Sequence, residues 1–171
     1  MPNWCENELR VTGDAGKLKA FREAVKSEGK LLDANKLIPY PEHFRRLDEI
    51  ASAWDQAHLV GGKFPEGVSL ADQPQDGFNS GGHEWQTENW GTKWGFCDVE
   101  VADEGEGYVE FIFTTAWGPL IPLIKKMGEM FPDLTFDLTY REGGVGFQGT
   151  LLIENGRVVK EEQGDYEEVA A

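Results

Sequence analysis

Hydrophobic and polar residues alternate at the start of the chain. Over Cys5–Val11 the apolar residues fall on one face and the charged residues on the other, which is the period-two pattern of a half-buried β-strand. Gly13 and Asp14 then supply a turn and a candidate N-cap. Apolar residues recur at helical spacing from Leu18 to Val25, so the pattern predicts one strand followed by one helix.

A second extended segment is predicted over Leu31–Ile38. It ends at Pro39 and Pro41, where proline forbids a continued helix and disfavours a central strand, so a first β-α-β unit closes there. From residue 42 to residue 94 the pattern loosens, with a helical stretch over His43–Leu59 and several loops rich in glycine and proline. We interpret residues 42–94 as an insertion.

Regular alternation returns after the insertion. Residues 97–101 and 108–117 are predicted as the two strands of a hairpin, and residues 120–131 follow as a second main helix. Residues 134–141 alternate again, and an Asn-Gly pair at 155–156 marks a terminal hairpin. This order predicts an α+β fold: a ferredoxin-like split β-α-β antiparallel sheet with the helices on one face and an inserted segment.

Chain length and charge narrow the class of protein. The 171 residues suit a single domain, 1–171, and 40% of them are hydrophobic, which is enough to fill a core. The 31 acidic and 16 basic residues give a formal charge of -15, which repels phosphate backbones and disfavours direct nucleic-acid binding. The same charge can attract a basic protein surface. The acid-rich residues 160–171 are predicted as a flexible tail.

Cysteine and histidine placement argues against disulfide, metal and catalytic chemistry. Cys5 and Cys97 are too few for a disulfide framework and form no C-x-x-C pair, so a reducing compartment is expected. His83 next to Glu84 lacks the second histidine of a zinc-protease helix. Cys5 could act as a nucleophile with a histidine base, but its strand is expected to bury the thiol. We therefore expect no enzyme activity, no metal and no cofactor.

The termini and hydropathy bear on location. The N-terminus has no basic region followed by an apolar run, and no stretch approaches the ~20 apolar residues of a membrane span. We therefore expect a protein of the bacterial cytoplasm that does not associate with membranes.

Three tryptophan-rich segments at predicted element ends form the strongest candidate site. They are residues 3–7, 89–94 and 114–119, and a glycine-rich segment follows at 140–149. In a pocket, tryptophan faces would stack on a planar, nucleotide-like ligand while Asn, Thr and Lys side chains fix its edges and charge. Alternatively, the same tryptophans fill the core and cover its edges. The candidate ligand-binding residues are Asn3, Trp4, Asn89, Trp90, Thr92, Lys93, Trp94, Thr115, Trp117 and Tyr140.

Spaced motifs across the chain resemble a known family. They are Pro2–Asn7 with Leu9, Val11 and Gly13; Asn89–Trp94; Thr115–Trp117 with Pro119; and Tyr140, Glu142, Gly143, Phe147 and Gly149. At these positions the chain is similar to the YubB-type ferredoxin-like domain of phage and conjugative-plasmid proteins, and it departs from that pattern at Gly95 and Leu120. The resemblance implies a ferredoxin-like fold and a mobile-element origin, without an established reaction.

Two hypotheses about function follow, from different classes. In the first, the chain is a non-catalytic accessory protein that captures a small nucleotide-like ligand in a tryptophan-lined pocket, as part of counter-defence. In the second, it is an acidic, DNA-mimicking inhibitor that binds a basic host protein such as a nuclease or a defence complex. The first requires tryptophans gathered around a cavity. The second requires carboxylates on one contiguous face.

Overall fold

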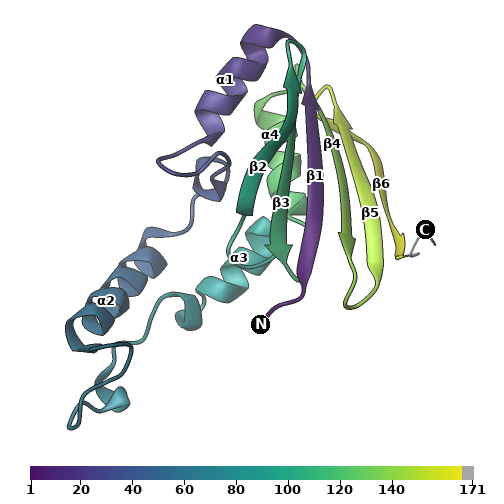
Figure 1. The fold of residues 1–171 in the computed structure, drawn as a ribbon. Coiled ribbons are helices and arrows are strands. Elements are labelled where there is room, and N and C mark those ends of the chain that lie inside the picture. The colour runs from purple at the N-terminus through teal and green to yellow at the C-terminus, as the bar shows by residue number, and fades with distance from the viewer. Residues whose placement is uncertain (167–171) are drawn as a thin grey trace. The chain divides into compact units, whose positions relative to one another are not determined.

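The structure, a computed structural model, describes residues 1–166 and contains a six-stranded antiparallel sheet with the order β2-β3-β1-β4-β5-β6 (Figure 1). The strands are β1 (Trp4–Thr12), β2 (Cys97–Gly105), β3 (Tyr108–Ala116), β4 (Thr135–Glu142), β5 (Phe147–Glu154) and β6 (Arg157–Asp165). The helices are α1 (Ala15–Val25), α2 (Glu42–His58), α3 (Gly82–Trp90) and α4 (Ile121–Met130). Short 3-10 turns are η1 (Ala34–Lys36), η2 (Leu70–Asp72) and η3 (Phe78–Ser80).

The strand order is that of a ferredoxin-like fold. β1 lies between β3 and β4 and pairs antiparallel with both. The chain therefore makes two split β-α-β units, β1-α1-β2 and β3-α4-β4. In the sheet, β3 lies between β1 and β2, and β1 lies between β3 and β4. β5 and β6 extend the sheet beyond β4 as a hairpin. The predicted α+β class with a ferredoxin-like antiparallel sheet is confirmed.

Local sequence signals explain several of the element ends. Asp14 is the N-cap of α1, and its carboxylate accepts hydrogen bonds from the backbone N–H groups of Gly16 (3.0 Å) and Lys17 (3.2 Å). Pro122 lies in the first turn of α4, where the missing N–H would have had no partner within the helix. Both residues of the Asn-Gly pair between β5 and β6 have positive φ, as a tight hairpin turn requires.

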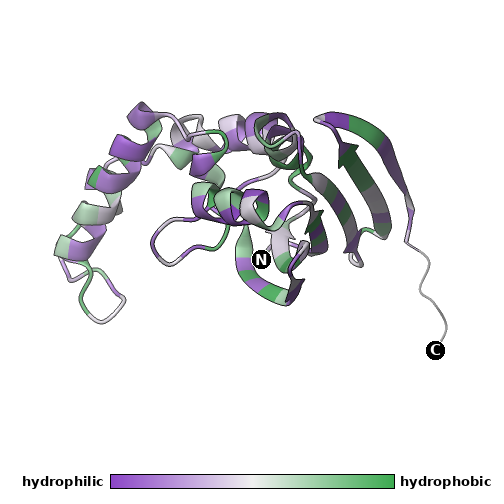
Figure 2. Cartoon of the chain, turned by 90° about the horizontal axis from the view of Figure 1, so that it is seen from above, coloured by the Kyte–Doolittle hydropathy of each residue, from purple (hydrophilic) through white to green (hydrophobic). Residues whose placement is uncertain are grey.

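Helices α1 and α4 cover one face of the sheet, and the core lies beneath them. Phe21 of α1 packs edge-to-face against Phe136 of β4, with 5.4 Å between the ring centroids. Leu9 of β1 lies in register with Phe111 of β3 and with Leu138 of β4, and all three are buried. Figure 2 shows the hydrophobic stretches along the strands. Each side chain of this kind contributes roughly 1.5–3 kcal/mol by leaving water.

The segment Leu31–Ile38 is not a strand, so that prediction is wrong. It contains the turn η1, because the Asp33 carboxylate accepts a hydrogen bond from the backbone N–H of Asn35 (2.9 Å) and stabilises a local turn. Leu32 and Leu37 bury their side chains from this irregular segment. The strand that completes the first split β-α-β unit is β2, which follows the predicted insertion.

Helix α3 and strand β6 also differ from the sequence prediction. α3 lies within residues 42–94, where the sequence pattern predicted a helix only over His43–Leu59 and took the glycines at 81–82 as loop markers. Residues 160–165, predicted as part of a flexible tail over 160–171, belong to β6 instead. Backbone pairing with β5 and an ion pair between Glu161 and Lys125 of α4 (2.8 Å) hold this acidic segment in place. The remainder of that tail, 167–171, lies outside the described residues.

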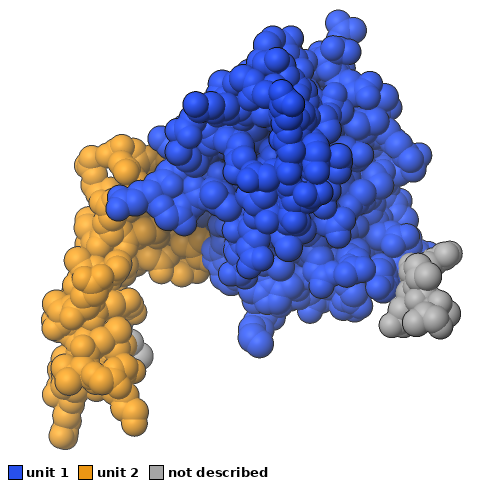
Figure 3. Space-filling view, turned by 45° about the horizontal axis from the view of Figure 1, so that its top comes forward, with its two compact units in different colours: residues 1–39, 86–171 blue, residues 40–85 orange. Residues whose placement is uncertain are grey.

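The chain divides into two compact units (Figure 3). Residues 1–39 and 86–171 form unit 1, which contains the sheet, and residues 40–85 form unit 2, which contains α2. Within unit 2, the Tyr40 hydroxyl donates to the Asp48 carboxylate at 3.1 Å. Unit 2 overlaps the predicted insertion 42–94, and its role as an insertion within one domain stays a prediction. No helix among residues 1–166 is long and apolar enough to span a bilayer.

Candidate binding face

The sheet face that α1 and α4 leave uncovered forms an open groove of about 1060 Å³. Runs of consecutive residues from the strands line this groove, and the side chains at alternate positions point towards it, because successive side chains of a strand point to opposite faces. Arg141 is the one cation among the described residues that line it. Five carboxylates line the groove: Glu6 and Glu8 of β1, Asp98 and Glu100 of β2, and Glu162 of β6. The groove is therefore strongly acidic.

The register of the strands arranges these side chains in rows across the sheet. Glu6 of β1 lies opposite Arg141 of β4, and we call this pair the Glu6 row. Glu8 of β1 lies opposite Ile112 of β3, which in turn lies opposite Glu100 of β2, and we call these three the Glu8 row. Directly opposite residues share a face of the sheet, with Cβ atoms about 4.5–5.5 Å apart. The two rows are therefore neighbours on the open face.

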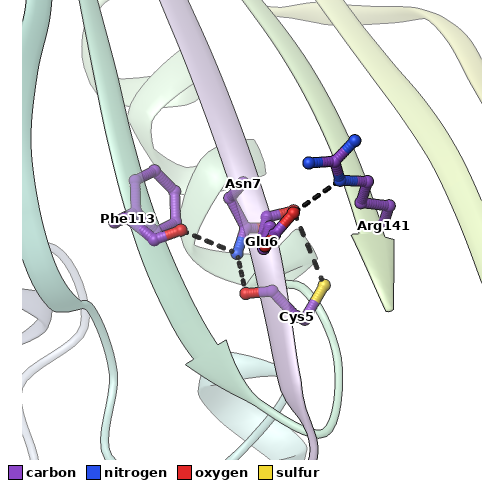
Figure 4. Close-up of polar contacts among 5 residues, drawn as sticks. All are labelled: Cys5, Glu6, Asn7, Phe113 and Arg141. Carbon is purple, nitrogen blue, oxygen red and sulfur yellow. Dashed lines mark hydrogen bonds and ion pairs between the residues drawn. The ribbon is translucent and has the colours of Figure 1, made fainter. Parts of the chain in front are cut away.

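The two rows differ in how their carboxylates are paired. In the Glu6 row, the Arg141 guanidinium donates to the Glu6 carboxylate at 2.5 Å (Figure 4). This hydrogen bond, together with the charge attraction, raises the pKa of Arg141. The Glu8 row contains two carboxylates, Glu8 and Glu100, neither of which forms an ion pair among the described residues.

A buried polar cluster lies on the covered face of the same strand. The Asn7 side-chain amide donates to the backbone oxygen of Cys5 (3.0 Å) and contacts the backbone oxygen of Phe113 (Figure 4). It also donates to the Thr115 hydroxyl at 3.0 Å. Burial, opposed by a hydrogen bond with Thr115, raises the pKa of the Cys5 thiol to about 11. The thiol is therefore protonated at neutral pH and a poor nucleophile. The described residues contain no group of three or more His, Cys, Asp or Glu side chains that could hold a metal ion.

Glu142 is a buried carboxylate that closes the turn after β4. Its two oxygens accept hydrogen bonds from the backbone N–H groups of Gly144 and Val145, each at 2.6 Å. Two bonds to the ionised form offset the cost of burying a charge. A Cβ atom at Gly144 would lie 2.5 Å from the Asn3 side-chain nitrogen, so a larger residue there would displace the Asn3 side chain. Glu142 thus shapes the glycine-rich turn from within the core.

Several predicted ligand-binding residues take part in the packing of the core. The Trp90 indole N–H donates to the backbone oxygen of Ile38 at 2.8 Å, and the Thr92 hydroxyl donates to the backbone oxygen of Ala116. Asn89 lies half-buried in the last turn of α3. The predicted site residues with buried side chains are Trp90, Thr92, Thr115 and Tyr140. Trp90 and Thr92 thus contribute hydrogen bonds to the fold, whereas Tyr140 also belongs to the residues that line the groove.

The other predicted site residues are more exposed. Trp4, Trp94 and Trp117 expose 42%, 46% and 48% of their surface. The Trp4 and Trp94 rings lie 6.3 Å apart, and the Lys93 ammonium lies 4.0 Å from the centroid of the Trp94 ring. The Trp117 backbone N–H donates to the backbone oxygen of Asn3 at 2.8 Å. The structure thus brings together Trp4, Lys93 and Trp94, which we call the Trp4 cluster, outside the residues that line the groove.

Sequence reasoning missed the carboxylates of the groove. The alternation over residues 5–11 already places Glu6 and Glu8 on the polar side of a strand. That pattern could not reveal that α1 and α4 both pack on the other side, or that β2 brings Glu100 alongside Glu8 with one strand between them. Each strand shows the alternation that places its carboxylates on the polar side, and only the strand order shows that these carboxylates lie together.

Comparison with known proteins supports the fold. Residues 89–170 match a family model described as the ferredoxin-like domain in Api92-like protein. The chain is also similar to the crystal structure of a protein api92 from Yersinia pseudotuberculosis, with a TM-score of 0.60, 13% sequence identity and coverage of 100% of both chains. None of the curated proteins matches it. At this identity the structural likeness shows the fold alone, and the YubB-type resemblance and the mobile-element origin stay predictions.

Proposed function

We propose that the protein is a non-catalytic binding protein whose open sheet face docks a basic surface of a protein partner. The observation that carries this proposal is the groove of about 1060 Å³, lined by five carboxylates and one arginine. A face of this charge repels anionic ligands and attracts cationic ones. An uncovered sheet face also offers a wide contact area, which suits a macromolecular partner.

Long-range charge supports the same function. The formal charge of -15 accelerates the encounter with a basic partner at low ionic strength, and salt weakens this attraction because the Debye length is only about 10 Å at 0.1 M. A basic partner in this proposal is a nucleic-acid-binding protein of the bacterial host, such as a nuclease or a defence complex. The protein would then act in the cytoplasm as a counter-defence inhibitor of mobile-element origin.

Titration calorimetry with defined peptides tests the proposed function. An oligolysine peptide and an oligoglutamate peptide of equal length are titrated into the full chain at two salt concentrations. We expect the oligolysine peptide to bind, its affinity to fall with salt, and the oligoglutamate peptide not to bind. The absence of oligolysine binding at low salt would overturn the proposal.

A matched pair of variants separates the groove from net charge. The first variant carries Glu8→Gln and Glu100→Gln in the groove, and the second carries Glu49→Gln and Glu66→Gln at exposed positions of unit 2. Both variants lose the same formal charge. We expect only the groove variant to lose oligolysine affinity. An equal loss in the two variants would show that net charge alone attracts the peptide.

The Trp4 cluster supports a second candidate function, the capture of a small nucleotide-like ligand. Two exposed tryptophan rings and the Lys93 ammonium would supply stacking surfaces and a positive charge for such a ligand. A titration of nucleoside triphosphates monitored by tryptophan fluorescence tests this function, with Trp94→Ala and Lys93→Ala as variants. A flat response across the panel would remove this candidate and would leave the groove proposal intact.

A further inference from the structure

Three neighbouring rows of side chains cross the open face, and the two outer rows contain their own cations. The Glu6 row contains Arg141, which pairs with Glu6 at 2.5 Å. The row on the other side contains Arg10, which pairs with Glu110 at 3.3 Å and lies 4.2 Å from the centroid of the Tyr108 ring. The Glu8 row lies between them and contains no cation among the described residues.

The Glu8 row places two carboxylates on either side of an apolar side chain. Ile112 belongs to β3, and Glu8 and Glu100 lie opposite it on β1 and β2. Neighbouring strands are about 4.8 Å apart, so both carboxylates can reach the space above Ile112. Ile112 is 36% exposed, which leaves apolar surface at the floor of the groove.

We infer that the Glu8 row is a subsite for a lysine or arginine side chain of the partner, whose aliphatic stem lies on Ile112 and whose charged head lies between Glu8 and Glu100. This inference rests on the proposed function. Long cationic side chains cover apolar surface with their stems while their heads stay near water and carboxylates. The same face already holds one cation in this manner beside a carboxylate, since the Arg10 guanidinium lies over the Tyr108 ring and pairs with Glu110 in the next row.

The neighbouring Arg141 limits where a second cation of the partner can bind. Its guanidinium already forms an ion pair with the Glu6 carboxylate, and the charge of Glu8 also contributes to the raised pKa of Arg141. A partner cation placed in the Glu6 row would meet like charge. We therefore expect one cation of the partner at the Glu8 row and a neutral or acidic residue opposite Arg141.

Single substitutions on the open face test the subsite with the oligolysine peptide. Glu8→Gln and Glu100→Gln are each expected to weaken binding about three- to fivefold, the size of one partly exposed ion pair. Asp137→Asn is the matched control. It removes the same charge from an exposed residue of β4 outside the groove lining, so we expect less than about a twofold change.

The length of the side-chain stem provides a second readout. A peptide of 2,4-diaminobutyric acid carries the same charge as oligolysine on a shorter stem, so it covers less of Ile112. We expect the unsubstituted protein to bind oligolysine more tightly than the short-stem peptide. Ile112→Ala is expected to abolish this preference, because the apolar floor is lost.

The outcomes separate the subsite from the proposed function. If oligolysine binds, and Glu8→Gln and Glu100→Gln weaken it more than Asp137→Asn does, the subsite is supported. If oligolysine binds and all three substitutions weaken it equally, or if stem length has no effect, the subsite is overturned and the docking face stands. If oligolysine does not bind, both are overturned.

Discussion

The two faces of the sheet are built from the same strands, yet their side chains contact different surroundings. On the covered face, Leu9 and Phe111 pack under the helices and are nearly inaccessible to solvent. On the open face, the adjacent residues Glu8 and Ile112 line the groove. Because side chains alternate between the two faces of each strand, one residue packs in the core and the next lies on the face proposed to bind a partner.

Buried polar residues sharpen this comparison at one end of the sheet. Glu142 lies on the covered face, and its carboxylate is fully paired with backbone N–H groups of the following turn. Glu8 and Glu100 lie on the open face and form no ion pair among the described residues. The carboxylates on the two faces thus have different roles, since Glu142 stabilises a turn whereas Glu8 and Glu100 can bind a cation.

The largest expected effect comes from neighbouring residues of β3. Phe111→Ala should lower the free energy of unfolding by about 3–5 kcal/mol, because it leaves a cavity under the helices. Ile112→Ala, one residue further along, should lower it by less than about 1 kcal/mol. Urea denaturation of the two variants measures both values. Equal losses would show that the open face is also part of the core.

A smaller effect is expected from two carboxylates of the same sheet end. Glu142→Ala should lower the free energy of unfolding by about 2–3 kcal/mol, because two backbone N–H groups lose hydrogen bonds to a charged acceptor. Glu6→Ala removes only an exposed ion pair with Arg141 and should cost less than about 1 kcal/mol. Thermal denaturation compares the two. A Glu142→Ala variant as stable as Glu6→Ala would contradict the structural role of Glu142.

The Cys5 thiol gives a pH-dependent prediction for the covered face. Its pKa is raised by burial from 9.0 to about 11, so folding favours the protonated thiol. The stability that this contributes is fully present below pH 9 and is lost as the pH rises towards 11. In Cys5→Ala, the decline in stability over this range should be shallower. An identical pH dependence in both proteins would contradict the raised pKa of Cys5.

The smallest effect is expected on the open face itself. Glu8→Gln combined with Glu100→Gln should change the free energy of unfolding by no more than about 0.5 kcal/mol, because both side chains are exposed and unpaired. Circular dichroism during urea denaturation measures it. A clear loss of stability would show that these carboxylates support the fold and would weaken the case for a binding face.

Much of the fold follows from local sequence signals. The alternation over residues 5–11, the N-cap at Asp14 and the Asn-Gly turn each specify an element through short-range physics. The strand predicted over Leu31–Ile38 was wrong, because the Asp33 carboxylate favours a turn where the apolar run indicated a strand. The prediction of a flexible tail was wrong for the acidic end of β6, because pairing with β5 depends on tertiary structure that no local pattern encodes.

The candidate site was harder to predict than the fold. Motif reasoning selected Trp90 and Thr92 for their residue types, and the structure buries both in hydrogen bonds to the backbone. It passed over Glu8 and Glu100, because exposed glutamates on strands are common and their neighbourhood depends on strand order. A site made by register across strands cannot be recognised from the spacing of residues along the chain.

Methyl NMR of the isoleucine side chains tests most directly whether the open face binds a basic partner. Ile112 faces the groove, whereas Ile124 and Ile153 are buried in the core. On addition of the oligolysine peptide, we predict that the Ile112 methyl signal shifts in proportion to occupancy while the Ile124 and Ile153 signals stay in place. Binding that leaves the Ile112 signal unchanged would contradict the assignment of the open face as the docking surface.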